Sequence, residues 1–195
     1  MENSAFMESI GDYIRSYKAE SLRVLDQISE VDLIQFVTLL DQVRSAGNQV
    51  FLCGNGGSAS TASHLANDLG KGASLGQVQR FRVLALTDNM PWITALANDL
   101  DYSQIFLEQL KNYAQPGDLL VVLSGSGNSP NVLEAVSWAN ENQIQTIGLT
   151  GRTGELGRLA QHTIRVDSAH MGHIEEAHFL IQHLISYFFM ESDSL

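Results

Sequence analysis

The sequence is poor in the residues on which several classes of protein depend. It has one cysteine, Cys53, so an internal disulfide framework is excluded. Cys53 stands at the end of an apolar run, which predicts a buried free thiol and fits a reducing compartment. Lysine and arginine number 11 against 22 acidic residues, for a formal net charge of -11. Because phosphate backbones are bound by clustered basic side chains, nucleic acid is not an expected direct partner.

The chain also lacks segments that would direct it into or across a membrane. No run of about 18 apolar residues occurs, and the first 21 residues, MENSAFMESIGDYIRSYKAES, include acidic side chains and no apolar signal-peptide core. We therefore expect no membrane partner and a cytoplasmic location. With 44% hydrophobic and 17% charged residues, the composition predicts one globular domain over residues 1–195.

Proline is absent from the first 46 residues, and Gly11 is their only glycine. Apolar residues recur there at helical spacing, which predicts two amphipathic helices that stop near Gly47. We describe residues 1–47 as a helical extension and residues 48–195 as an α/β core. The two helices carry more apolar surface than one sheet face can cover, which favours a homo-oligomer. The alternative is that they fold back onto their own domain.

Five short apolar runs follow, each bounded by glycine or turn residues. They predict strands at 49–53, 81–86, 118–123, 144–149 and 162–166. Helical sequence lies between them, for example at 58–69, 92–98, 130–142 and 153–161, and a long final helix is expected over 172–190. Short runs that are apolar throughout are typical of strands covered on both faces. The alternation of strands and helices therefore predicts a three-layer α/β/α sandwich with a five-stranded parallel sheet.

A serine-rich loop follows the predicted strand 118–123, in the sequence VVLSGSGNSPNV. Its three hydroxyls and the backbone N–H groups near its glycines converge at a helix start, where the helix dipole favours an anion. One such residue is enough to cap a helix, and a cap is the alternative explanation. Three hydroxyls in six residues favour a phosphate site. The expected contacts come from Ser124, Gly125, Ser126 and Ser129.

A second glycine-rich turn, CGNGGSAS at 53–60, follows the first strand and also leads into a helix. Ligand sites in parallel sheets lie outside the carboxyl ends of the strands, so the two loops should face one crevice. The spacing matches neither the dinucleotide fingerprint nor the P-loop. A small phosphorylated substrate held by hydroxyls and amides is therefore expected. The contacts from this turn are Asn55, Gly56, Gly57 and Ser58.

Two pairs of titratable residues fall on the helices nearest this crevice. His64 and Asp68 are four apart and share a helix face. Glu175 and His183 are eight apart on the final helix, about 80° apart around its axis. Two histidines and two carboxylates on facing helices can hold a divalent ion such as Zn²⁺. The alternative is that all four are ordinary polar residues of two amphipathic helices.

The segments FLCGNGGSASTASHLANDL and LSGSGNSPNVLEA together resemble the sugar isomerase (SIS) domain and, within it, the phosphoheptose isomerases. Those enzymes convert sedoheptulose 7-phosphate to D-glycero-D-manno-heptose 7-phosphate. The resemblance covers nearly the whole chain and implies a flavodoxin-like version of the predicted fold, a sugar phosphate as substrate and a homotetramer. Some members of this family do not catalyse. The alternatives are therefore a protein that binds a protein partner, like the replication-initiator-associating members, and a phosphosugar sensor.

The resemblance also implies roles for the titratable residues. In phosphoheptose isomerases a His and a catalytic Glu follow the first loop, a Gln and a catalytic His lie on the last helix, and in metal-bearing members these four ligate zinc. The matching positions here are His64, Asp68, Glu175 and His183. Asp68 and His183 are thus the expected catalytic pair for an enediol mechanism, which needs a base and a carrier for the hydroxyl proton.

Two of these positions depart from the family pattern. Asp68 is shorter than the usual Glu by one methylene, and Glu175 is acidic where the family has Gln. A further carboxylate strengthens the binding of a divalent cation. Gly172 and His173 replace an Asp and an Arg that the family commonly has before that Gln, so a different phosphosugar is an alternative substrate.

Overall fold

The predicted strands form a single sheet in which every neighbouring pair is parallel. The structure, a computed structural model, describes the backbone of residues 2–192 and the side chains of residues 6–192. Within that range the strand order is β2-β1-β3-β4-β5. The strands are β1 (Gln49–Gly54), β2 (Arg82–Ala85), β3 (Leu119–Ser124), β4 (Gln145–Gly151) and β5 (His162–Val166).

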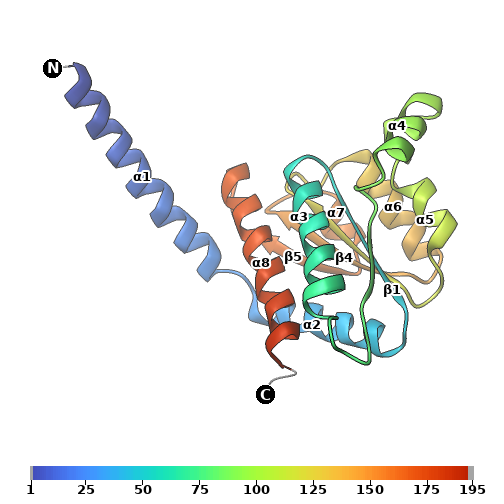
Figure 1. Ribbon diagram of the computed structural model, residues 1–195. Helices are drawn as coiled ribbons and strands as arrows, with labels where there is room; N and C mark the ends of the chain where they lie inside the picture. The colour runs from blue at the N-terminus through green and yellow to red at the C-terminus, as the bar shows by residue number, and fades with distance from the viewer. Residues whose placement is uncertain (1, 193–195) are drawn as a thin grey trace.

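Helices precede, separate and follow the strands (Figure 1). They are α1 (Glu2–Asp26), α2 (Glu30–Ser45), α3 (Gly57–Asn67), α4 (Met90–Asp99), α5 (Leu107–Tyr113), α6 (Pro130–Glu141), α7 (Leu156–Leu159) and α8 (Met171–Ser192), with the short turns η1 (Asp68–Gly72) and η2 (Tyr102–Gln104). The helix expected over 153–161 is only four residues long, because Gly154 has a φ of +128° and cannot be helical. α5 and η2 were not predicted.

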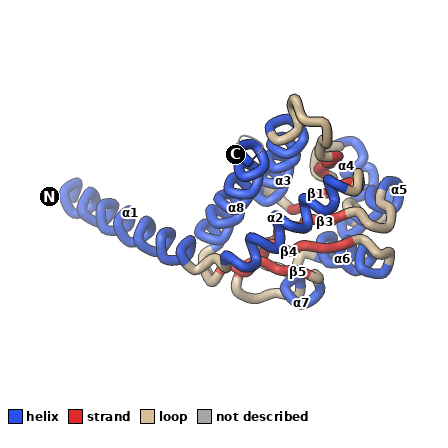
Figure 2. Tube along the Cα trace, turned by 90° about the horizontal axis from the view of Figure 1, so that it is seen from below, coloured by secondary structure: helices blue, strands red, loops and turns tan. Residues whose placement is uncertain are grey.

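Alternate residues of the central strands pack into two separate cores, as expected of a sheet covered on both faces. Along β3, Val121 and Leu123 face the layer of α2, α3 and α8, whereas Leu120 and Val122 face α5, α6 and α7. Figure 2 shows the strands lying between the helices of these two layers. The three-layer sandwich predicted from the sequence is therefore confirmed.

The two N-terminal helices behave differently. α2 packs against the sheet through four buried residues, Phe36, Leu39, Leu40 and Val43. α1 instead extends away from the sheet (Figure 1). Most of its described apolar side chains are exposed: Phe6, Met7, Ile10, Tyr13, Ile14 and Leu22. α2 therefore folds back onto its own domain, whereas most of α1 does not.

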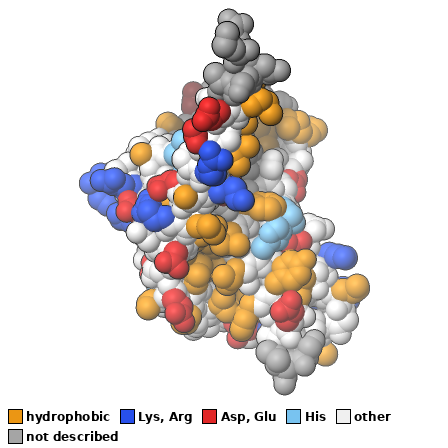
Figure 3. Space-filling model, turned by 90° about the vertical axis from the view of Figure 1, so that its left-hand side faces the viewer, with side chains coloured by type: hydrophobic (Ala, Val, Ile, Leu, Met, Phe, Trp, Pro, Cys, Tyr) orange, Lys and Arg blue, Asp and Glu red, His pale blue; other side chains and the backbone are white. Residues whose placement is uncertain are grey.

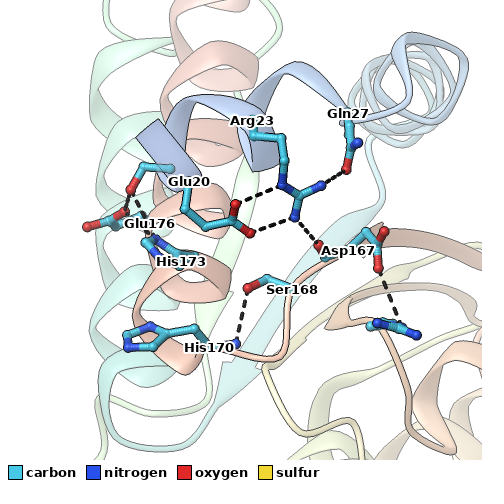
Figure 4. Close-up of polar contacts among 10 residues, drawn as sticks. Glu20, Arg23, Gln27, Asp167, Ser168, His170, His173 and Glu176 are labelled. Carbon is cyan, nitrogen blue, oxygen red and sulfur yellow. Dashed lines mark hydrogen bonds and ion pairs between the residues drawn. The ribbon is translucent and has the colours of Figure 1, made fainter. Parts of the chain in front are cut away.

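The last turns of α1 are held against the start of α8 by a small apolar cluster of Val24 with Ile174 and Ala177, and by polar contacts (Figure 4). The Ser21 hydroxyl lies 3.0 Å from His173 Nδ1 and donates to Glu176. Arg23 pairs with Glu20 and donates to the backbone oxygen of Asp167 at 3.1 Å. These contacts fix the direction in which α1 leaves the domain.

Cys53 is a free and fully buried thiol, as predicted. Burial raises the pKa of this thiol, so it remains protonated and packs as a small apolar side chain. No helix in residues 2–192 combines the length and the apolar character needed to cross a membrane.

Gly127 and Gly47 provide a matched test of how tightly the serine-rich loop is packed. Their φ values are 66° and 73°, so alanine at either position adds left-handed strain of about 1–2 kcal/mol. At Gly127 the new Cβ would also lie 2.6 Å from the Thr150 hydroxyl, whereas at Gly47 it would meet nothing within 4 Å. We expect Gly127→Ala to lower the free energy of unfolding by about 1–3 kcal/mol more than Gly47→Ala, as measured by urea denaturation. Equal losses would show that the loop has room to adjust.

Candidate active site

Both predicted phosphate loops lie at one edge of the sheet. β1 and β3 are neighbours, with Gly54 paired to Leu123 at their carboxyl ends. From β1 the chain crosses to β2, and from β3 it crosses to β4 on the opposite side. A change of direction of this kind leaves a crevice outside the strand ends, where parallel α/β proteins bind ligands.

A cavity of about 180 Å³ occupies this crevice. Six of the eight predicted phosphate contacts line it: Asn55, Ser58, Ser124, Gly125, Ser126 and Ser129. Three further residues, which were not predicted to bind phosphate, complete the lining: Leu123, Met171 and Glu175. Gly56 and Gly57 lie in the same turn, between Asn55 and Ser58. The two loops and the first turn of α8 therefore enclose one small site.

The hydroxyl of Ser129 is not used as a helix cap. Ser129 is the N-cap residue of α6, yet its side chain makes no capping hydrogen bond within the described residues. The Ser124 hydroxyl does stabilise the loop, because it accepts the backbone N–H of Gly127 at 3.1 Å. Capping thus accounts for neither hydroxyl, and Ser129 stays available to a ligand at the N-terminus of α6.

A hydrogen-bond network anchored on the buried Asn131 orients Asn55 at the edge of the cavity. The carboxamides of Asn55 and Asn131 exchange two hydrogen bonds, of 3.0 and 2.8 Å, and the Tyr102 hydroxyl donates to Asn55 Oδ1 at 3.0 Å. Asn131 is only 1% exposed, so its side chain is held rigidly. Sequence analysis missed Asn131 and Tyr102, since no local pattern pairs residues this far apart.

His64, Asp68 and His183 come together further along the same two helices. One ligand atom from each lies within 4.8 Å of the others. His64 Nε2 is 3.3 Å from Asp68 Oδ2, and the His64 and His183 rings have centroids 5.0 Å apart. Phe179 packs against both rings and forms an apolar wall beside them. We call these three residues the His/Asp/His group.

Asp68 is the most buried member of the group. It begins η1, a π-helical turn in which its backbone oxygen accepts the N–H of Ala73. Single π turns interrupt helices frequently at functional sites. The Asp68 carboxylate accepts a hydrogen bond from Asn67 Nδ2 at 3.1 Å. The Ser186 hydroxyl lies 3.4 Å from Asp68 Oδ2 and 3.2 Å from the His183 backbone oxygen, and its one proton serves one of these acceptors at a time. The carboxylate is therefore held in place from both α3 and α8.

Glu175, the fourth expected ligand, is not part of this group. Its carboxylate lies against the backbone of Gly57, where an added Cβ would be 3.3 Å from Glu175 Oε1. Eight residues of α-helix rise about 12 Å, which places Glu175 and His183 at different levels of α8. Glu175 thus lines the phosphate cavity, and metal ligation through it stays a prediction.

The three residues of the His/Asp/His group could hold a metal ion. Metal sites that bind a substrate commonly use three nitrogen or oxygen ligands from the protein and leave a further position open. His64 has a side chain 37% exposed, so the group is open to solvent on one side. The residues present therefore fit a divalent metal ion.

Comparison with known proteins places the chain in a family. The SIS domain family matches residues 12–151. The chain is 34% identical over 189 residues to the phosphoheptose isomerase of Aneurinibacillus thermoaerophilus, which covers 90% of this chain and 91% of that protein. It is 42% identical over 141 residues to the phosphoheptose isomerase of Rhodospirillum rubrum, with 72% and 74% covered.

Solved structures agree with these relationships. The phosphoheptose isomerase from Neisseria gonorrhoeae superimposes with a TM-score of 0.84 at 29% identity, over 95% of this chain and 100% of that one. The enzyme from Francisella tularensis gives 0.86 at 29% identity, over 92% and 97%. This chain therefore belongs to the SIS domain family and, within it, to the phosphoheptose isomerase type.

Proposed function

We propose that this enzyme is a phosphosugar aldose–ketose isomerase that converts sedoheptulose 7-phosphate to D-glycero-D-manno-heptose 7-phosphate. One observation carries the proposal: the cavity lined by the two loops lies at the N-terminal ends of α3 and α8, and the His/Asp/His group lies further along the same helices. Gly57 and His64 are seven residues apart, or about 10 Å along the helix. This separation is comparable to the length of an extended sugar phosphate. The names of the relatives support the choice of a heptose.

The phosphate end of the substrate is held without a basic side chain. No lysine or arginine lines the cavity in the described chain. Binding there relies on serine hydroxyls, on backbone N–H groups and on the N-terminal end of the α6 dipole. Glu175 at the cavity edge accepts hydrogen bonds from sugar hydroxyls and disfavours a second anionic group at that point.

The reaction moves one proton between two carbons and one between two oxygens. Asp68 removes a proton from C1 of the open-chain ketose, while the C2 carbonyl oxygen receives a proton through His183, which gives an enediol. Loss of the O1 proton and return of a proton to C2 then produce the aldehyde, with no net change in atoms or electrons. Asp68 and His183 suit these roles because they face one another across α3 and α8.

The His/Asp/His group is also the site that we propose for a divalent ion, zinc in the first instance. His64, Asp68 and His183 would hold the ion, which would supply Lewis-acid polarisation of a substrate oxygen. Because ligation lowers the basicity of a carboxylate, Asp68 would act as the base only once substrate oxygens had replaced it as a ligand. The alternative base is Glu175, but its place beside Gly57 makes Asp68 the better candidate.

We also propose that the chain forms a homotetramer. Between α2 and α8 lies an open groove of about 420 Å³, lined mostly by apolar residues: Leu33, Ile34, Val37, Leu184 and Phe188, with Glu30 and Thr38. Figure 3 shows apolar side chains gathered on this face of the molecule. Exposed apolar surface of this size is typical of an interface.

The non-catalytic alternatives remain a partner-binding SIS protein and a phosphosugar sensor. The His/Asp/His group favours catalysis, because neither alternative needs a base and a proton carrier beside a phosphate site. A cytoplasmic location and the absence of a nucleic-acid partner stay predictions from composition, and so does the division of the single domain at residue 47.

Substitutions in the serine-rich loop test the phosphate site. Replacing Ser126 and Ser129 with alanine should weaken sugar phosphate binding by about 1–3 kcal/mol, the range for hydrogen bonds to a charged group. The measurement is isothermal titration calorimetry with sedoheptulose 7-phosphate. Ser137→Ala, on α6 but outside the cavity, is the matched control. Unchanged affinity in the double variant would contradict this assignment.

Substitutions in the His/Asp/His group test the chemistry. His183→Gln and Asp68→Asn should each lower kcat about 10²–10⁴-fold, the usual contribution of a general acid or base, while sugar phosphate binding changes little. Asp68→Glu, which restores the residue usual in the family, should keep or raise heptose isomerisation. His162→Gln, at the opposite end of the sheet, serves as the control. If His183→Gln and Asp68→Asn both turn over substrate at the unmodified rate, the His/Asp/His group has a structural role and the catalytic assignment is wrong.

Light scattering at micromolar concentration tests the assembly. The unmodified chain should have four times the mass of one chain, whereas Leu184→Glu and Phe188→Glu should give smaller species because they charge the apolar groove. Val78→Glu is the control, since Val78 is fully exposed and lies outside the groove. A monomeric unmodified chain would rule the tetramer out.

A further inference from the structure

Unpartnered polar atoms gather in one part of the interior. Among the described residues, six buried side-chain nitrogen or oxygen atoms have no hydrogen-bond partner. Five of the six belong to three residues, Thr150, His178 and Gln182. His178 and Gln182 lie one helical turn apart on α8, whereas the Thr150 hydroxyl, at the end of β4, lies on the other face of the sheet beside Gly127. Because buried polar groups in native proteins are almost always paired, this concentration calls for an explanation.

His178 is buried as a neutral imidazole. It is 1% exposed, and desolvation lowers its pKa to about 4. The nearby Thr150 backbone raises this pKa by a smaller amount. One ring nitrogen is therefore a donor and the other an acceptor at neutral pH. Both lack a partner, while the Gln182 carboxamide, at 0% exposure, also has a donor and an acceptor to offer.

These residues continue a polar stripe that ends at Asp68. His178, Gln182 and Ser186 follow one another at intervals of four on the buried face of α8. Ser186 is itself fully buried, and its hydroxyl lies 3.4 Å from Asp68 Oδ2. The flexible carboxamide of Gln182 sits between an imidazole one turn before it and a hydroxyl one turn after it.

The other end of the stripe touches the serine-rich loop. Thr150 pairs in the sheet with Ser124, and its hydroxyl lies so close to Gly127 that an added Cβ there would be 2.6 Å away. The next residue, Gly151, donates its backbone N–H to the oxygen of Gly125 at 3.1 Å. The serine-rich loop is therefore in direct contact with the end of β4.

We propose that His178 and Gln182 are positioning residues that join Thr150 to Ser186 through buried hydrogen bonds and so tie the orientation of Asp68 to the phosphate loop. This inference rests on the proposed isomerase function of the same site. The hydrogen bonds of this link would be formed by the four unpartnered atoms of His178 and Gln182, after rotation of side chains that do not make them in this structure. The Thr150 hydroxyl is not one of these atoms, because it lies on the other face of the sheet beside Gly127. The link gives the enzyme a means of holding its base in the reactive orientation when the phosphate site is occupied.

The competing explanation is that the unpartnered polar groups of the stripe lower the stability of the protein and have no function. Replacing a buried polar side chain that lacks partners with an apolar one of similar shape leaves stability unchanged or raises it. Stability alone therefore does not separate the two explanations. Turnover does, because only a positioning role links Gln182 to the rate of the chemical step.

The first experiment measures steady-state kinetics and thermal unfolding of Gln182→Leu, His178→Leu and the double variant. We expect kcat to fall at least tenfold in each single variant, KM to change less than threefold and the melting temperature to stay or rise. The double variant should lose no more than the worse single one, since one break already interrupts the stripe. Unchanged kcat in both single variants would overturn the proposal.

Gln109→Leu is the matched control. Gln109 is another buried glutamine, 2% exposed, but its amide donates to the backbone oxygens of Leu86 and Ile105 on the other side of the sheet. We expect it to lower the melting temperature without changing kcat. A loss of kcat in Gln182→Leu that merely followed a loss of folded protein would also count against a positioning role.

A second measurement does not depend on turnover. Saturating inorganic phosphate should shift the ring ¹⁵N NMR signals of His178 and of the His/Asp/His group in the unmodified protein. In Gln182→Leu the His178 shift should remain and the shift of the group should disappear. If the group's signals do not respond in the unmodified protein, the link is absent. If they respond but no phosphosugar is turned over, the proposed function fails and the link stands.

Discussion

The parallel pairing of β1 with β3 is the constraint on which the rest of the site depends. Parallel strands end at the same edge of a sheet, so the loops after Gly54 and Leu123 meet there. The chain then crosses in opposite directions from the two strands, which keeps that edge open. α3 and α8 cover the same face of the sheet, and their side-by-side packing brings His64 to His183.

The charge distribution at this edge is unusual for a site proposed to take phosphate. The protein carries a net charge of -11, and the cavity places Glu175 beside four serines. Fixed dipoles rather than basic side chains must therefore stabilise the anion. Hydroxyls and backbone amides held by a rigid loop do so at little entropic cost, because Gly127 and Gly151 are already bonded within the fold.

The sheet brings the loops and helices of the site close to one another, and polar interactions in the interior then orient individual side chains. Asn131 orients Asn55 at the phosphate end, and Ser186 holds Asp68 at the other end. Hydrogen bonds of this kind are stronger away from water, and an unmade one is correspondingly costly. The same α8 face that carries Ser186 also carries His178 and Gln182, so the helix is both a core element and a carrier of site residues.

The sequence by itself determined the strands, the sandwich and the two loops, because apolar runs and glycine-rich turns are local signals. It also placed His64 with Asp68, since residues four apart on a helix share a face. Tertiary structure alone decided that His183 joins them while Glu175 lies at the phosphate cavity, because helix spacing does not say how far α8 is shifted along α3. The pairing of Asn55 with Asn131 likewise depends on how the two loops meet, which no local pattern records.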